Sequence, residues 1–270
     1  MAITRVLITV KTYPTISTKY DELVCTAGFR EDGSWIRIYP VQFTKRPYHE
    51  QYSKYQWIEV DLVKNTKDPR PESFRPVSHD TEIKIIGEIG TDGDAWHERR
   101  KLVLNRVRCN LAELIAEAKE KRVCTSLAVF KPTKILDFVW EPVEREWDQE
   151  KLAALQQMNL FESASERRQE VVKKLPYKFS YVFQDAVGKE STLMIEDWET
   201  GALFWNMLKR TGTEELACQA VRQKYLHDFA QTKDLHFYLG TTQQFHFVGH
   251  NPFLIVGTFH PKHIIQTTLF

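Results

Sequence analysis

The stretch Val24–Pro40, VCTAGFREDGSWIRIYP, decides the fold of this chain. It predicts a β-hairpin closed by Asp32 and Gly33, because an Asp-Gly pair supplies the positive φ angles of a tight two-residue turn. Side chains alternate between the two faces of a strand, and the arms around this turn alternate in character. The hairpin therefore has one face for a core and a second face with different chemistry.

The register about this turn assigns the side chains to the two faces. The predicted cross-strand pairs are Arg30 with Trp35, Gly28 with Arg37, and Thr26 with Tyr39. Trp35, Arg37 and Tyr39 then share one face, and Gly28 leaves open space over Arg37. The other face is apolar and points at a core; it holds Ala27, Phe29, Ile36 and Ile38.

The face of Trp35, Arg37 and Tyr39 has two interpretations. Aromatic rings stack on bases and an arginine pairs with phosphate, so the face suits single-stranded nucleic acid or another charged planar ligand. In the alternative, Trp35 and Tyr39 cover a second sheet or a helix, and Arg37 pairs with an acid.

The composition excludes several classes of protein. The chain has 270 residues, 42% of them hydrophobic, which is enough for one large domain or two ordinary domains with a substantial core. Lys and Arg number 37 against 36 Asp and Glu, so any nucleic-acid site must be a local patch. None of the four cysteines lies in a C-x-x-C pair, so neither a zinc ribbon nor a redox motif is indicated.

The N-terminal segment Met1–Val10 reads as a short strand with Arg5 inside it, and it lacks the pattern of a signal peptide. No apolar run approaches membrane-spanning length. We therefore expect a soluble cytoplasmic protein with no membrane partner.

The order of predicted elements indicates a β-rich α+β fold. Short strands with turns between them are typical of a small barrel or sandwich; they are expected at Val6–Val10, Trp57–Val63, Ser73–Val77 and Glu82–Glu88. Helices are expected at Asp94–Leu104 and at Asn110–Lys121, the second capped by Asn110. Strand character returns over Cys124–Val139.

A polar segment over residues 141–175, with a helix at Asp148–Gln157, is the best linker in the chain. The predicted domains are therefore 1–140 and 176–270, joined by 141–175. After the linker, alternating aromatic residues predict a buried strand; they are Tyr177, Phe179, Tyr181 and Phe183. Asp197 is expected to cap a helix, and the closing strands are expected at His236–Leu239, Phe245–Val248 and Phe253–Phe259.

Four blocks of the sequence resemble a bacterial family described as the dual OB-containing domain. They are KTYPTISTKYDELVCTAGFREDGSWIRIYP (11–40), PYKFSYVFQDAVGKESTLMIEDWETGALFW (176–205), FYLGTTQQFHF (237–247) and NPFLIVGTFHP (251–261). The resemblance implies two OB-like β-barrels with inserted or packed helices, and association with mobile-element and phage-defence genes. It implies no catalytic signature. OB barrels bind oligonucleotides or oligosaccharides on one face, but a fold alone does not define a function.

The predicted function is a binding module, not an enzyme, for single-stranded nucleic acid or a nucleotide-type ligand, with no cofactor. The aromatic rings would stack on bases and the basic groups would pair with phosphate. The predicted ligand-binding residues are Lys11, Tyr13, Arg30, Trp35, Arg37 and Tyr39.

Two other functions stay open. Asp61 on one strand and Glu82-Ile-Lys84 on another resemble the layout of metal-dependent nucleases, in which carboxylates hold Mg²⁺ and the lysine steadies the attacking water or the phosphate. The protein is alternatively an interaction subunit of a defence system, whose aromatic faces meet a partner protein. The late histidines indicate surface or core positions rather than a zinc site; they are His246, His250, His260 and His263.

Overall fold

The computed structural model describes residues 3–17, 21–78, 80–93, 95–150, 152–153 and 172–264. The chain divides into two compact units, one of Met1–Gly87 with Glu141–Lys178 and one of Glu88–Trp140 with Phe179–Phe270. The predicted domain borders at residues 140 and 176 do not coincide with these units, because 88–140 groups with the C-terminal segment. Most of the predicted helix Asp148–Gln157 lies outside the described residues.

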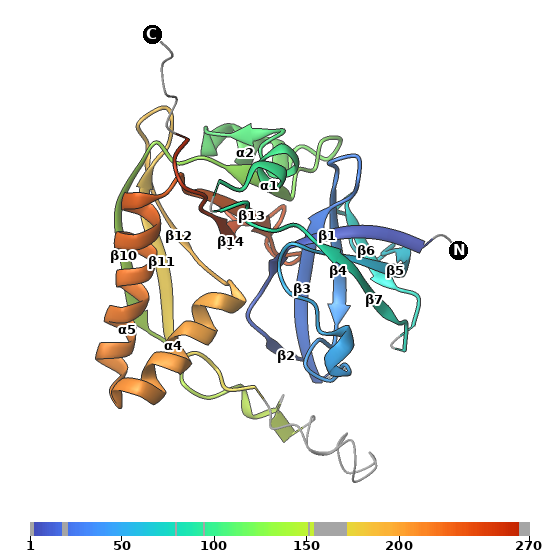
Figure 1. Cartoon of the computed structure of the whole chain (residues 1–270), viewed down its shortest axis with the longest axis horizontal. Coiled ribbons are helices and arrows are strands. Elements are labelled where there is room, and N and C mark those ends of the chain that lie inside the picture. Colours follow the sequence, from blue (N-terminus) through green and yellow to red (C-terminus); the bar gives the residue numbers. More distant parts are fainter. Residues whose placement is uncertain are drawn as a thin grey trace. The chain divides into compact units, whose positions relative to one another are not determined.

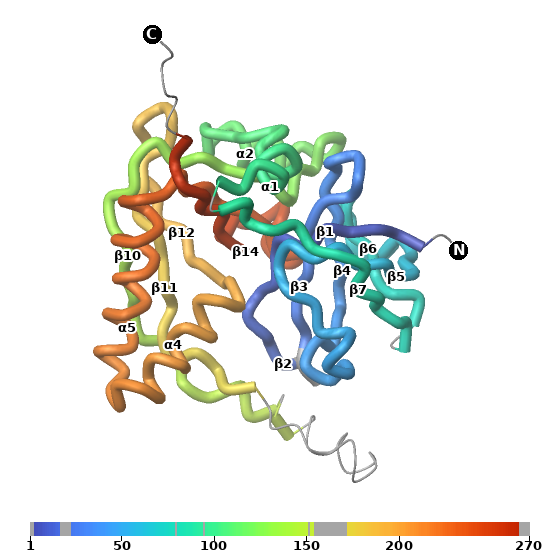
Figure 2. Tube along the Cα trace, in the orientation of Figure 1, coloured from blue at the N-terminus to red at the C-terminus, as the bar shows by residue number. Residues whose placement is uncertain are grey.

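The first unit is built around a closed five-stranded β-barrel, which confirms the predicted small barrel in this part of the chain. Its elements are β1 (Ile3–Lys11), β2 (Thr15–Ser17), β3 (Asp21–Phe29), β4 (Trp35–Val41), a 3-10 turn (Tyr48–Glu50), β5 (Gln56–Lys64), β6 (Ser73–Pro76) and β7 (Ile83–Glu88). The ring runs β1-β3-β4-β6-β5 and closes through β1 and β5 (Figure 1). Of the pairs that form this described ring, β4–β6 is parallel and the others are antiparallel. Figure 2 traces the path, in which β2 and β7 extend the sheet outside the ring.

The barrel core follows from strand register, because directly paired residues point to the same face. Ile8 pairs with Gly28, and Gly28 pairs in turn with Ile36. At the other edge of β1, where it pairs with β5, Val6 pairs with Ile58. These interior side chains are fully buried, together with Ile38 and Val60.

The hairpin forms between the predicted strands, but its predicted register is wrong by one residue. The Arg30 N–H donates to Ser34 O (2.9 Å) and the Gly33 N–H to Arg30 O (2.9 Å), which closes a three-residue loop. Gly33 supplies the positive φ of such a loop, +77°. The observed pairs are Phe29 with Trp35, Gly28 with Ile36, Ala27 with Arg37 and Thr26 with Ile38. A one-residue slip moves side chains to the opposite face, so Phe29 and Ala27 lie with Trp35 and Arg37 and not with the isoleucines.

Gly28 does not open space over Arg37, which corrects a second expectation. A Cβ atom at Gly28 would lie 1.9 Å from the carbonyl oxygen of Leu7 on β1. The β1–β3 register also shifts between Ile8 and Val10. Gly28 is therefore required where β1 and β3 approach each other closely.

The second unit contains two sheets. The first has the order β10-β11-β12 and the second β14-β13-β9-β8. The strands are β8 (Val107–Arg108), β9 (Leu127–Phe130), β10 (Lys134–Pro142), β11 (Tyr177–Gln184), β12 (Glu190–Met194), β13 (His236–Thr241) and β14 (Phe253–Phe259). A parallel bridge between Ile195 and Ile255 links the sheets. A second closed barrel, expected from the resemblance, is not shown by the described residues.

Helices cover one face of the three-stranded sheet (Figure 1). The helical elements of this unit are α1 (His97–Val103), α2 (Leu111–Lys119), α4 (Trp198–Thr211), α5 (Glu214–Arg222) and a π-helical segment (Gln223–Ala230). Phe138 of β10 stacks on Tyr225, and Tyr181 of β11 donates from its hydroxyl to the Tyr225 carbonyl (2.8 Å).

The caps predicted at Asn110 and Asp197 are confirmed. None of the described helices is both long enough and apolar enough to span a membrane.

The strand predicted at Phe245–Val248 is wrong. This segment belongs to a compact turn between β13 and β14, and β13 pairs with β14 and β9 instead. The turn is closed by a hydrogen bond from the Gly249 N–H to Phe245 O (2.9 Å). The alternation that suggested a strand comes from one buried histidine, His246, between two exposed phenylalanines.

Replacing Gly28 by alanine is expected to lower the free energy of unfolding by about 3 kcal/mol, because the new methyl group meets backbone that has to move. Urea denaturation measures this change. Gly87→Ala is the matched control, since a Cβ atom at this strand position meets nothing within 4 Å. Equal stability of the two variants would contradict the close approach at Gly28.

Candidate functional site

Arg37 is buried inside the first unit, although the sequence placed it on a ligand-binding face. It is 2% exposed, and its Nη1 donates to Glu72 Oε1 (3.3 Å). Its backbone N–H also donates to Glu72 O (2.8 Å). Burial and the nearby Arg70 lower the pKa of Arg37. These contacts match the alternative interpretation of the sequence, in which Arg37 pairs with an acid.

A second buried ion pair lies beside Arg37. Arg70 Nε and Nη2 donate to the two carboxylate oxygens of Asp68, at 2.8 and 2.6 Å. The Ser73 hydroxyl donates to Asp68 Oδ2 (2.7 Å). Burial acts to raise the pKa of Asp68, but the bonds and charge of Arg70 with the bond from Ser73 outweigh it and lower the pKa from 3.8 to about 2. These bonds hold the β5–β6 loop against the start of β6.

Trp35 and Arg30, two other predicted binding residues, contact aromatic side chains of the barrel strands. Trp35 packs on Phe29 with ring centroids 4.0 Å apart. Arg30 lies over the Phe74 ring and donates to the Trp35 carbonyl (3.1 Å), and burial lowers its pKa. Since the register that joined Arg30 to the face of Trp35 is wrong, these residues do not form the predicted arrangement.

Lys11, Tyr13 and Tyr39 lie at the end of β1, in the segment after it, and on β4. Lys11 Nζ lies 4.2 Å from the centroid of the Phe43 ring. The Tyr13 hydroxyl donates to the Lys173 carbonyl (2.7 Å). Tyr39 is half-buried and directly precedes Pro40. A ligand-binding role for the predicted set stays a prediction.

The nuclease hypothesis rests on Asp61, Glu82 and Lys84. Asp61 lies on β5, and its buried Oδ1 has no hydrogen-bond partner among the described residues. Glu82 and Lys84 flank the buried Ile83, and both are exposed. In the part of the chain that the structure describes, no three His, Cys, Asp or Glu side chains are grouped to hold a metal ion. The hypothesis stays a prediction.

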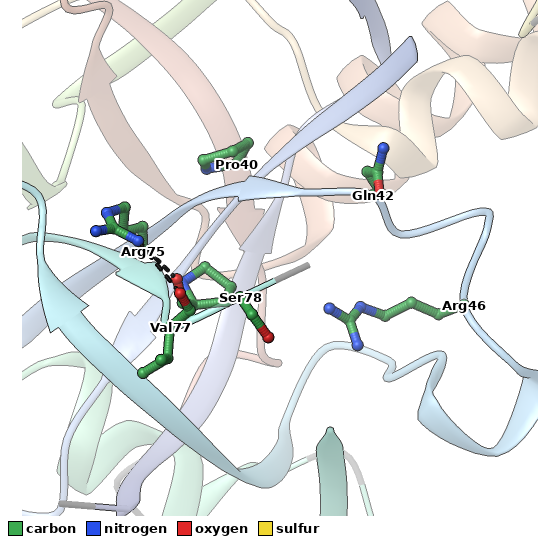
Figure 3. Close-up of a pocket in the computed structure, with 7 residues that line it drawn as sticks. Pro40, Gln42, Arg46, Arg75, Val77 and Ser78 are labelled. Carbon is green, nitrogen blue, oxygen red and sulfur yellow. Dashed lines mark hydrogen bonds between the residues drawn. The ribbon is translucent and has the colours of Figure 1, made fainter. Parts of the chain in front are cut away.

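A pocket of about 140 Å³ opens where the parallel strands β4 and β6 end (Figure 3). Its lining residues are Pro40, Gln42, Arg46, Arg75, Pro76, Val77 and Ser78. The pocket is smaller than the roughly 300–1,000 Å³ typical of small-molecule sites, so it suits one phosphate-sized group rather than a whole nucleotide.

The pocket is cationic. Arg46 is mostly buried, and its Nη1 donates to Glu50 Oε2 (2.7 Å) and to the Thr81 carbonyl (2.8 Å), so its charge is balanced. Arg75 is exposed, and among the described residues its Nη1 makes long bonds to the carbonyls of Pro76 (3.3 Å) and Val77 (3.4 Å). Arg75 therefore supplies the charge for an anionic ligand.

Sequence reasoning missed Arg46 and Arg75. Neither belongs to a local motif, and 29 positions separate them in the chain. They line one pocket because β6 pairs in parallel with β4. The only local signal was the position of Arg75 inside a predicted strand.

Two protein families match the chain. One is described as a domain of unknown function (DUF8758) and matches residues 2–105; the other is described as a domain of unknown function (DUF8757) and matches residues 107–270. Because the second match covers more than half of the chain, the chain belongs to that family. The border between the matches falls between α1 and β8. No curated protein matches the chain.

The Asp68 cluster predicts a specific acid sensitivity. Because the folded-state pKa of Asp68 lies below its ordinary value, its carboxylate stabilises the fold above pH 3.8, and this contribution is lost as the pH falls towards 2. The contribution is about 2 kcal/mol. Asp68→Asn is expected to lose it at neutral pH and to show a flatter decline of stability in acid.

Urea denaturation at a series of pH values measures this dependence. Glu98→Gln is the control, because Glu98 pairs with Lys101 on an exposed helix surface and its loss costs less than about 0.5 kcal/mol. Parallel acid profiles for Asp68→Asn and the unsubstituted protein would refute the role given to Asp68.

Proposed function

We propose that the first unit is a binding module for a phosphate-bearing ligand of the nucleotide type, either a single-stranded nucleic acid or a nucleotide. The ligand's phosphate enters the pocket beside Arg75. The observation that carries this proposal is the exposed guanidinium of Arg75 at a phosphate-sized pocket whose other arginine, Arg46, is already balanced by Glu50.

The barrel topology supports the proposal. Numbered without β2, the ring has the order 1-2-3-5-4, and the parallel pair joins its third and fifth strands. We regard this ring as an OB-like barrel, an architecture that binds oligonucleotides beside its second and third strands. Those strands are β3 and β4, and β4 ends at Pro40 in the pocket wall.

The pocket offers several hydrogen-bond donors to a phosphate group. Arg75 makes a charge-assisted bond, and the Ser78 hydroxyl and the Gln42 amide add neutral donors. Tyr39 adjoins Pro40 and is the predicted stacking residue best placed in sequence to contact a base. In this proposal the protein binds and positions its ligand without catalysing a reaction.

The resemblance to the dual OB-containing domain supports the wider setting. It favours a second OB-like arrangement in the second unit, where the bridge between Ile195 and Ile255 links the two sheets. It also favours a cytoplasmic role in a bacterial defence or mobile-element system, with a partner protein of that system.

Arg75→Gln is expected to weaken binding of thymidine 5′-diphosphate at least about tenfold, because a charge-assisted hydrogen bond contributes about 1.5–3 kcal/mol. Calorimetric titration measures the dissociation constant, with thymidine as the ligand that lacks phosphate. Arg5→Gln is the control, since Arg5 is an exposed arginine of the same unit outside the pocket. Equal affinity for the diphosphate and for thymidine would contradict the proposal, as would unchanged binding by Arg75→Gln.

A further inference from the structure

The turn between β13 and β14 displays two aromatic side chains on the surface of the second unit. Phe245 is 50% exposed and Phe247 37% exposed. Val248 of the same turn is also exposed, and we call this exposed apolar segment the Phe245–Phe247 platform. The described residues around it leave these side chains open to solvent, although large apolar side chains are normally buried.

A buried histidine holds this platform in place. His246 is fully buried; its Nε2 lies 3.2 Å from Cys124 Sγ and its Nδ1 lies 2.8 Å from Thr241 Oγ1. The Phe247 ring packs edge-on against the imidazole, with centroids 4.5 Å apart. With His246 held inside the turn, the side chains on both sides of it point outwards.

Two more bonds restrain the turn. The Gly249 N–H donates to Phe245 O (2.9 Å), and Lys119 Nζ donates to the His250 carbonyl (3.2 Å). The contacts of Lys119 and Cys124 join the turn to the end of α2 and to the segment that follows it. The aromatic rings are therefore presented by a pre-organised loop, which reduces the entropy lost on binding.

Positive charge lies on the segment that contacts this turn through Cys124 and Lys119. Lys119, Lys121 and Arg122 are all exposed and lie directly before Val123. Glu120 is the one acid among them, and its Oε1 accepts from the Arg122 N–H. Exposed aromatic rings joined to a basic segment match the chemistry of single strands, in which bases stack and phosphates pair with Lys and Arg.

We propose that the Phe245–Phe247 platform is a binding surface for single-stranded nucleic acid. Successive bases stack on Phe245 and Phe247, and Lys121 and Arg122 contact the adjoining phosphates. The basic segment favours this occupant over a protein partner. The platform belongs to the second unit, so the proposal goes beyond the pocket of the first unit and does not depend on it.

The test is fluorescence anisotropy with a labelled oligothymidine of about ten nucleotides, a length within the usual range for single-strand sites. The double variant Phe245→Ala and Phe247→Ala is expected to bind at least about tenfold more weakly, because each stack accounts for a large share of affinity. The matched controls are Leu216→Ala and Val187→Ala, which truncate other exposed apolar side chains of the same unit, 47% and 64% exposed. Both controls are expected to bind as the unsubstituted protein does.

A second arm measures salt dependence. The double variant Lys121→Gln and Arg122→Gln is expected to reduce the slope of log affinity against log salt by about 0.7 for each phosphate group that the variant no longer neutralises. The diphosphate titration of Arg75→Gln is independent of both arms, so failure at the pocket and failure at the platform are distinguishable. Thermal unfolding is expected to be nearly unchanged in all these variants, because the side chains are exposed.

Three outcomes would overturn the proposal. One is the absence of oligothymidine binding by the unsubstituted protein, and another is unchanged binding after both phenylalanines are truncated. The third is self-association that disappears in the phenylalanine variant while oligothymidine affinity stays constant, which would assign the platform to a protein interface.

Discussion

The first unit depends on a short parallel seam between β4 and β6. This seam contains two registered pairs, Arg37 with Ser73 and Ile38 with Phe74. Without it the ring would open, because β6 is the strand that connects β4 to β5. So short a pairing supplies few backbone hydrogen bonds. Buried polar side chains add to it, because Arg37 bonds to Glu72 and Ser73 bonds to Asp68.

Buried charges in such a cluster also favour one strand register over others. Desolvation offsets most of the attraction within a buried ion pair, whereas a buried charge that loses its partner destabilises a fold by about 3–5 kcal/mol. A slip of the β4–β6 seam would separate Arg37 from Glu72 and leave both charges uncompensated. The cluster therefore disfavours other registers, and the selected register places Pro40 and Pro76 together at the pocket. The candidate site is thus a consequence of how the barrel closes.

Local signals predicted the types of most elements, because periodicity, turn residues and caps act over a few positions. Asn110 caps α2 as expected, and the β-rich first unit is a barrel. The hairpin loop was less predictable: Gly33 provides a positive φ in a two-residue or a three-residue loop, and only strand pairing decides between them. The one additional residue in the loop determines which side chains lie beside Arg37. Arg46 and Arg75 were beyond local reasoning altogether, since a parallel pairing between distant strands brings them to one pocket.

The near balance of 37 basic and 36 acidic residues explains why shaped sites matter in this chain. A protein without a broad positive field gains little affinity from counterion release alone, so binding to a polyanion has to come from particular groups. In the pocket Glu50 balances Arg46, and under the proposed function Arg75 supplies the charge for one phosphate rather than for a long backbone. The platform joins exposed rings to a basic segment, an arrangement in which stacking contributes affinity that salt does not screen. The two proposed surfaces would therefore divide the work on one class of ligand, the pocket taking a phosphate group and the platform the faces of unpaired bases.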